Sequence, residues 1–106
     1  MKGMTKEVNV KAIFTKFTKD DPWVRGSCGR YNFAAKLYDI GSTFGINEGR
    51  VSKLGIIDEN NKLVVDYDRW VLGMEPKTQD EKEAYQAIME LLENAPTRYK
   101  EGSDFE

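Results

Sequence analysis

Residues 51–67, VSKLGIIDENNKLVVDY, contain two apolar segments separated by a short polar segment. The two apolar segments, Val51–Ile57 and Leu63–Tyr67, are rich in the β-branched and aliphatic residues that favour strands. Between them, Asp58-Glu59-Asn60-Asn61 has the composition of a turn. The sequence therefore predicts an antiparallel hairpin here, and the remaining elements are expected to assemble around it.

A second clear strand is expected over Arg30–Tyr38, before the hairpin. Its residues alternate in character, with Tyr31, Phe33, Ala35 and Leu37 on one face. This face is the better candidate for the core, because the other face includes Asn32 and Lys36.

The N-terminal third is less regular. Val8–Phe17 alternates in the manner of a strand, and Trp23 and Val24 either begin a short strand or anchor over the sheet edge. Gly26–Gly29 is expected to be a flexible turn that leads into the Arg30–Tyr38 strand.

Residues 78–94 are predicted to form one amphipathic helix. Thr78 and Glu81 have the spacing of a capping box, in which each side chain satisfies a backbone amide near the other residue. The helical apolar stripe comprises Ala84, Ala87, Ile88, Leu91 and Leu92. Pro96 is expected to stop the helix.

Together these elements predict a small α+β fold, in which an antiparallel sheet of about four strands packs against one C-terminal helix. The 106 residues suffice for one domain, expected over residues 1–96. Asp68–Lys77 is interpreted as a linker, and residues 97–106 as a loose polar tail.

The composition excludes several classes of site. The chain contains no histidine, which removes zinc–histidine sites, Ser-His-Asp triads and imidazole bases. Cys28 is the only cysteine, and a structural thiol is favoured over a nucleophile. No apolar run approaches the ~20 residues of a membrane span, and no apolar signal core follows the N-terminus. A soluble, cytoplasmic protein without enzymatic activity, cofactor or metal is expected.

The charge is unevenly distributed along the chain, although the net charge is only −2. Residues 1–55 carry ten Lys/Arg against five Asp/Glu, a net of +5, and residues 56–106 carry six against thirteen, a net of −7. This asymmetry indicates either an acidic interaction surface or two mixed-charge surfaces whose elements interleave in space.

The segment 39–50 contains Gly41, Gly45 and Gly49 and ends in Arg50. Glycine amides and an arginine could bind a phosphate. However, the segment lacks the Gly-Lys-Ser/Thr ending of a P-loop and leads into a strand rather than a helix. A structural loop is therefore the favoured interpretation.

The second half contains two candidate clusters. Asp66, Asp68 and Glu75 could supply oxygen ligands to a divalent ion, but the EF-hand spacing is not met, and solvated strand ends are favoured. Tyr67, Arg69 and Trp70 form an aromatic–cationic cluster of the kind enriched at protein interfaces. Ordinary packing explains this second cluster equally well.

Basic and aromatic residues also interleave in the first half, which could indicate a platform for single-stranded nucleic acid. Because the aromatics alternate with the cations, they are expected to face the core, and a pI of about 5.3 also disfavours this interpretation. The residues concerned are Lys11, Phe14, Lys16, Phe17, Lys19, Trp23, Arg25, Arg30 and Tyr31.

Residues 31–39, YNFAAKLYD, and 44–54, FGINEGRVSKL, resemble a family of short uncharacterised proteins from phages and prophages of Gram-positive bacteria. Residues 58–60, DEN, residues 67–70, YDRW, and the C-terminal helix are similar to the same family. The resemblance covers about residues 23–94 and provides no catalytic residue. It implies a small phage-type accessory protein made inside a bacterium.

Such proteins often bind and block a host protein, including CRISPR effectors, and by this analogy we expect a non-enzymatic inhibitor of a host complex. Its carboxylates would occlude a basic nucleic-acid-binding groove on the partner, with Tyr67, Arg69 and Trp70 as anchors. The alternative is a nucleic-acid-binding factor of phage replication, and a homodimer is compatible with either. The predicted partner-binding residues are Asp66, Tyr67, Asp68, Arg69, Trp70, Glu75, Asp80, Glu81, Glu83, Glu90 and Glu93.

Overall fold

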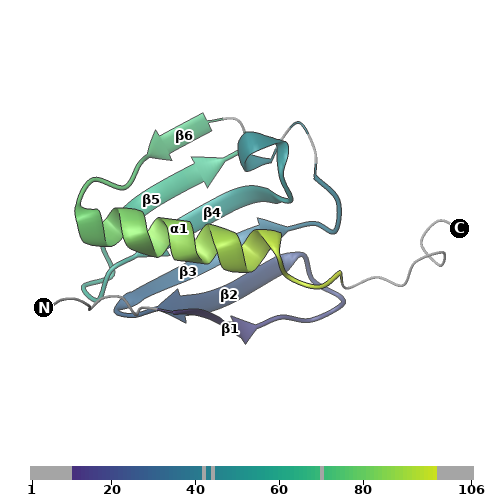
Figure 1. Cartoon of the computed structure of the whole chain (residues 1–106), viewed down its shortest axis with the longest axis horizontal. Coiled ribbons are helices and arrows are strands. Elements are labelled where there is room, and N and C mark those ends of the chain that lie inside the picture. The colour runs from purple at the N-terminus through teal and green to yellow at the C-terminus, as the bar shows by residue number, and fades with distance from the viewer. Residues whose placement is uncertain (1–10, 42, 44, 70, 98–106) are drawn as a thin grey trace, which may run out of the picture.

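The computed structural model describes residues 11–41, 43, 45–69 and 71–97. These residues form six strands and one α-helix (Figure 1). The elements are β1 (Ala12–Lys16), β2 (Trp23–Cys28), β3 (Tyr31–Leu37), β4 (Val51–Ile57), β5 (Leu63–Asp68), β6 (Val71–Met74) and α1 (Gln79–Glu93).

The strands form one sheet in the order β1-β2-β3-β4-β5-β6, and each strand is antiparallel to the next. The expected β4–β5 hairpin is confirmed, with Ile56 opposite Val65 and Gly55 opposite Asp66. The α+β class is confirmed as well, but the sheet has six strands rather than about four.

Two of the expected connections are strands. Gly26–Gly29 is not a turn: Gly26 lies within β2, opposite Phe14 on one side and Phe33 on the other. The turn is confined to Gly29, whose φ is 61°, and Arg30. The sequence pattern indicated a turn because of Gly26, since glycine is rare in strand interiors unless another group approaches closely.

The expected linker Asp68–Lys77 contains the edge strand β6. Arg69 has a φ of 61°, which begins a tight reversal between Asp68 and Val71, two residues that lie opposite each other in the sheet. The first strand is shorter than Val8–Phe17: β1 covers Ala12–Lys16, and residues 8–10 lie outside the described residues.

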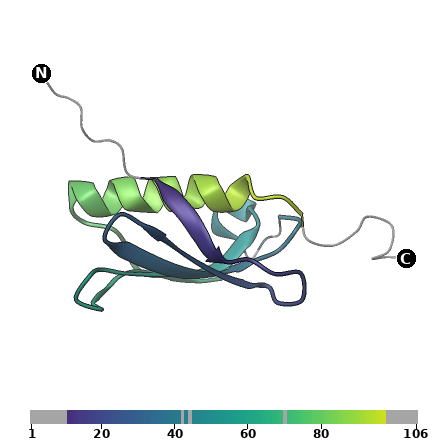
Figure 2. The same ribbon diagram turned by 90° about the horizontal axis from the view of Figure 1, so that it is seen from below.

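Helix α1 crosses one face of the sheet (Figures 1 and 2). The predicted core face of β3 is confirmed, because Tyr31, Phe33, Ala35 and Leu37 are all buried beneath the helix side of the sheet. The helix contributes Ala84, Ile88 and Leu92, which are three positions of the predicted stripe. Burial of these apolar side chains is the main force that holds α1 on the sheet.

The predicted capping box is present at the start of α1. The Glu81 amide donates to Thr78 Oγ1 at 3.1 Å, and the Thr78 amide donates to Glu81 Oε1 at 3.1 Å. The amide of Lys77 also donates to Glu81 Oε1, at 2.7 Å. These amides lower the pKa of the Glu81 carboxyl, with Lys77 making the largest contribution.

Thr78→Ala is expected to lower the free energy of unfolding by about 1 kcal/mol, because the Glu81 amide loses its acceptor.

Glu81→Gln is expected to lower the free energy of unfolding by an amount that depends on pH. A carboxyl whose pKa is lowered by folding stabilises the fold above its unfolded pKa and loses that effect as the pH falls through its folded pKa. Urea unfolding should therefore separate Glu81→Gln from wild type near pH 7, and the difference should be smaller near pH 3. A constant difference at both pH values would contradict this origin.

Candidate functional surfaces

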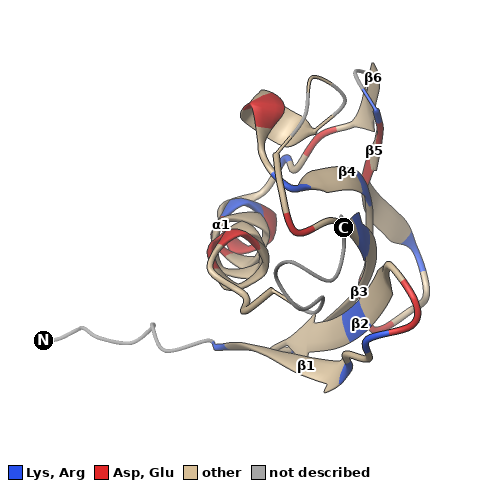
Figure 3. Ribbon diagram, turned by 90° about the vertical axis from the view of Figure 1, so that its right-hand side faces the viewer, with Lys and Arg blue, Asp and Glu red and all other residues tan. Residues whose placement is uncertain are grey.

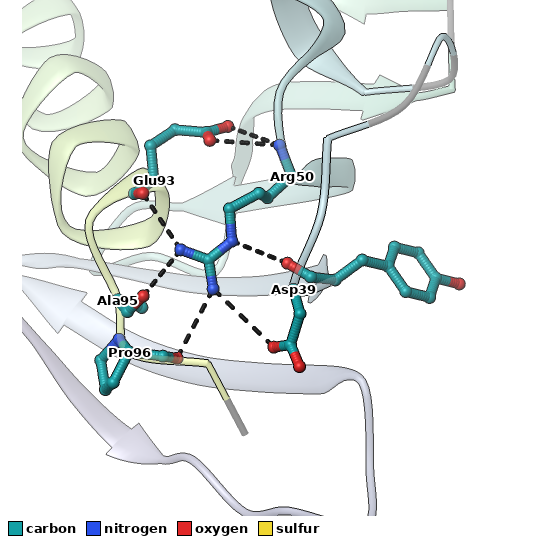
Figure 4. Close-up of polar contacts among 6 residues, drawn as sticks. Asp39, Arg50, Glu93, Ala95 and Pro96 are labelled. Carbon is teal, nitrogen blue, oxygen red and sulfur yellow. Dashed lines mark hydrogen bonds and ion pairs between the residues drawn. The ribbon is translucent and has the colours of Figure 1, made fainter. Parts of the chain in front are cut away.

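The glycine-rich segment between β3 and β4 is held in place by Arg50. The Arg50 guanidinium donates through Nε to the carbonyl oxygen of Tyr38 at 2.8 Å, and through Nη1 to those of Glu93 at 3.1 Å and Ala95 at 2.7 Å (Figure 4). Nη2 lies 3.5 Å from the carbonyl oxygen of Pro96. We call this set the Arg50 cluster, and it joins the loop to the C-terminal end of α1.

The backbone of the same loop already binds a carboxylate. The Arg50 amide donates to both carboxylate oxygens of Glu93, at 3.1 and 3.0 Å (Figure 4). A Cβ on Gly49 would overlap this carboxylate, and a Cβ on Gly45 would overlap the carbonyl oxygen of Gly49. At Gly41 a Cβ would lie 2.5 Å from the carbonyl oxygen of Glu48. The carboxylate bound at this loop is therefore the chain's own Glu93 side chain, held by the Arg50 amide beside Gly49, whereas Gly41 and Gly45 approach backbone carbonyl oxygens.

The solvent-facing side of α1 is acidic. Helix α1 contains five Asp/Glu and one lysine, and Glu83, Gln86 and Glu90 are exposed along one line of it. Beside Gln86 and Glu90 lies a groove of about 480 Å³, which is also lined by Asn47 and Met89. We call Glu83, Gln86, Glu90 and this groove the acidic helix face.

The other predicted acidic residues of the helix already have partners within the chain. Asp80 lies 3.1 Å from Nη2 of Arg30, Glu81 caps the helix, and Glu93 accepts the Arg50 amide. For Glu90, no hydrogen bond or ion pair of the side chain is seen among the described residues, and the Glu83 carboxylate accepts there only from Nε2 of the Gln79 side chain, at 3.1 Å. Glu83 and Glu90 are thus the helical carboxylates most available to a partner.

Asp66 and Asp68 lie on the opposite side of the sheet from α1. They are exposed and alternate with Tyr67, which packs against the core and whose pKa is raised by burial. The structure therefore does not bring the predicted acidic residues together on one surface.

Arg69 and Glu75 are exposed near the ends of β6, and Trp70 lies outside the described residues. Within the described part of the chain, no group of acidic residues or cysteine is arranged to hold a metal ion.

The side of the sheet away from α1 is not covered by any other described element (Figures 2 and 3). Four large apolar side chains lie exposed there: Ile13 (53%), Trp23 (37%), Leu63 (39%) and Val71 (60%). Cross-strand neighbours place Arg25, Lys36 and Lys53 on this side of β2–β4, with Asp66 and Asp68 on β5. We call this surface the open face.

The sequence pattern did not predict the open face as a surface, although it indicated which residues of single strands lie away from the core. The alternation of β3 indicated that Asn32 and Lys36 share a face. What the sequence lacked was the register that brings Lys36 opposite Trp23 on one side and Lys53 on the other. Recognising β2 over its full length would have supplied the first of these pairings.

The structure separates the basic–aromatic set of the first half. Phe14 and Tyr31 pack in or against the core, whereas Trp23 and Arg25 are exposed on the open face. Cys28 is fully buried, and burial raises the pKa of its thiol, which keeps it protonated and poorly nucleophilic.

Comparison with protein families gives a match over most of the chain. The model of a domain of unknown function, DUF7678, matches residues 22–93. The chain belongs to this family. No curated protein and no solved structure matches it. Among the described residues of this DUF7678 protein, no helix has the length and apolar character needed to cross a membrane.

Proposed function

We propose that this DUF7678 protein is a non-enzymatic binding protein that attaches to a basic surface of another protein through its acidic helix face. The observation that supports this most directly is the line of Glu83, Gln86 and Glu90 beside a groove of about 480 Å³. The carboxylates of Glu83 and Glu90 are exposed and make few contacts within the described part of the chain, so lysine or arginine side chains of a partner can approach them.

The resemblance to phage and prophage proteins suggests the setting. In the cytoplasm of a bacterial host, basic protein surfaces commonly bind nucleic acid, and covering such a surface would inhibit the protein. CRISPR effectors are host proteins of this kind. The proposed role is therefore that of a phage-type inhibitor that covers such a surface. The acidic set that does this is narrower than the sequence indicated, because Asp80, Glu81 and Glu93 interact within the fold.

The double variant Glu83→Lys/Glu90→Lys is expected to lose at least about tenfold in partner affinity, because two attractive contacts become repulsive. Tagged wild-type and variant proteins would be used to capture partners from nuclease-treated host lysate, and a partner found by mass spectrometry would then be purified. The affinity of the purified partner for wild type and for the double variant would be measured. The affinity of the partner for its own nucleic acid would be measured in the presence and absence of the wild-type DUF7678 protein.

Lys82→Glu provides the opposite change of charge, since Lys82 lies one helical turn before Gln86 and its replacement adds a carboxylate beside the acidic helix face. It should leave the partner's affinity unchanged or slightly higher. A purified partner that binds wild type and Glu83→Lys/Glu90→Lys equally, or that keeps its nucleic acid in the complex, would overturn the proposal.

A further inference from the structure

The middle of the open face carries a row of residues with an antisymmetric charge pattern. Register places Arg25 opposite Ala34, Ala34 opposite Gly55, and Gly55 opposite Asp66. Residues directly opposite in antiparallel strands lie on the same side of a sheet. The row therefore crosses β2–β5 as cation, small residue, small residue, carboxylate.

We propose that the open face binds a second copy of this chain, sheet against sheet. Two sheets that pack face to face keep their strands roughly aligned, about 10 Å apart. A two-fold axis parallel to the strands, between Ala34 and Gly55, places β2 of each copy over β5 of the other. Arg25 of each copy then meets Asp66 of the other, and the small residues allow close approach at the centre.

The charge pattern also selects this axis over the other two-fold arrangement. An axis perpendicular to the strands would place each strand over its own equivalent, so that Arg25 could not meet Asp66, and an axis along this row would bring Arg25 over Arg25 and Asp66 over Asp66. Like charges brought together in an interface are unfavourable. Only the axis parallel to the strands turns the row into two attractive pairs.

The apolar side chains of the open face fit the same arrangement. Exposed apolar residues gathered on one surface are typical of an interaction site. Arg25, Asn32, Ala34, Gly55, Ile57 and Leu63 line a shallow hollow of about 400 Å³. Leu63 of the second copy falls over Ser27, because Ser27 and Leu63 belong to the same row of β2–β5. That position lies next to the hollow, where burial of Leu63 stabilises the pair.

One feature of the face limits the affinity. The neighbouring row, Trp23–Lys36–Lys53–Asp68, brings Lys36 of one copy near Lys53 of the other. Lys53 is already 3.7 Å from Asp68, and this row lies at one end of the strands, where long lysine stems can carry the charges to solvent. The sheet face projects to about 25 by 20 Å, or about 500 Å², which is smaller than the ~800 Å² per partner of a standard interface. A weak, concentration-dependent dimer is expected.

Sedimentation equilibrium of the full chain and its charge variants tests the proposal. Wild type should dimerise below about 1 mM. Arg25→Asp and Asp66→Arg should each weaken the dimer at least about tenfold, because each creates two like-charge pairs. An equimolar mixture of these two variants should dimerise again, since both cross-copy pairs are then oppositely charged. Lys36→Gln should tighten the dimer, and Lys82→Asp on α1 should leave it unchanged.

Circular dichroism would confirm that each variant is folded, and recovery in the mixture itself requires folded partners. A wild-type chain that stays monomeric to about 1 mM would overturn the proposal. So would a dimer that neither charge variant weakens, or a mixture that does not recover. Binding of a single-stranded oligonucleotide by monomeric wild type, lost in Arg25→Asp, would assign the open face to nucleic acid instead. The dimer leaves α1 free, so the result is independent of the proposed function.

Discussion

Gly26→Ala is expected to lower the free energy of unfolding by about 3 kcal/mol or more, at the upper end of the cost of overpacking. Gly26 is buried in β2 between β1 and β3. A Cβ there would overlap the backbone carbonyl oxygen of Ile13 and would lie 2.5 Å from Cζ of Phe33. The phenyl ring can rotate away, but the Ile13 oxygen can move only if β1 separates from β2. For a domain of this size, the melting temperature should fall by about 12 °C or more.

Gly55→Ala is the matched control, because it is the same substitution in a central strand of the same sheet. A Cβ at Gly55 would meet only Cδ1 of Leu63, at 3.9 Å, which is ordinary van der Waals contact. Its stability should change by less than about 1 kcal/mol. Thermal unfolding at low protein concentration compares the two variants without interference from association. Equal melting temperatures for Gly26→Ala and Gly55→Ala would show that the contact with β1 is not what requires glycine.

The same glycine shows why the sequence predicted only part of the sheet. Where strands alternate regularly, as in β3 and the β4–β5 hairpin, the pattern of apolar residues predicted both the strands and the buried face. Gly26 is in β2 because Phe33 and the Ile13 backbone occupy the space of its side chain. That cause lies on neighbouring strands, so no pattern local to residues 23–28 reveals it.

The candidate surfaces show a similar limit. Composition predicted an excess of carboxylates in the second half, but a carboxylate's availability depends on what it contacts. Glu93 faces the Arg50 amide, which is 43 residues away along the chain. Asp66 lies across the sheet from α1 because strand residues alternate between faces. Both facts depend on how the strands pair and on where the helix lies on the sheet, and the local sequence pattern provides neither.

The two proposed surfaces lie on opposite sides of the sheet and are therefore compatible. If the open faces of two copies pack together, each acidic helix face points outward from the dimer. Such a dimer would present two separate sites to a partner, and linked sites raise the overall affinity without any new contact. Variants that weaken the dimer, such as Arg25→Asp, should consequently keep the affinity of each single acidic helix face for the partner. They should lose only the increase in overall affinity that comes from linking two such faces.

Arg50→Ala is expected to lower the free energy of unfolding by about 3 kcal/mol, because four carbonyl oxygens and the Asp39 carboxylate lose a charged partner. Its side chain is only 13% exposed, so most of its contacts in the native protein are with protein atoms. Arg50→Lys should restore less than half of the loss, since an ammonium group lacks the planar fork that reaches Tyr38 and Ala95 together. Urea unfolding measures both effects, with Lys82→Ala as a control on the exposed side of α1.

The position of the lost contacts also predicts where the structure loosens. Arg50 binds the carbonyl oxygens of Glu93, the last residue of α1, and of Ala95, two residues beyond it, and these oxygens would otherwise depend on water. In Arg50→Ala, hydrogen exchange should therefore accelerate first at the amides of Asn94 and Ala95, before it does at Ile88 in the middle of the helix. Uniform acceleration along α1 would show instead that Arg50 stabilises the fold as a whole, without a specific role at the helix end.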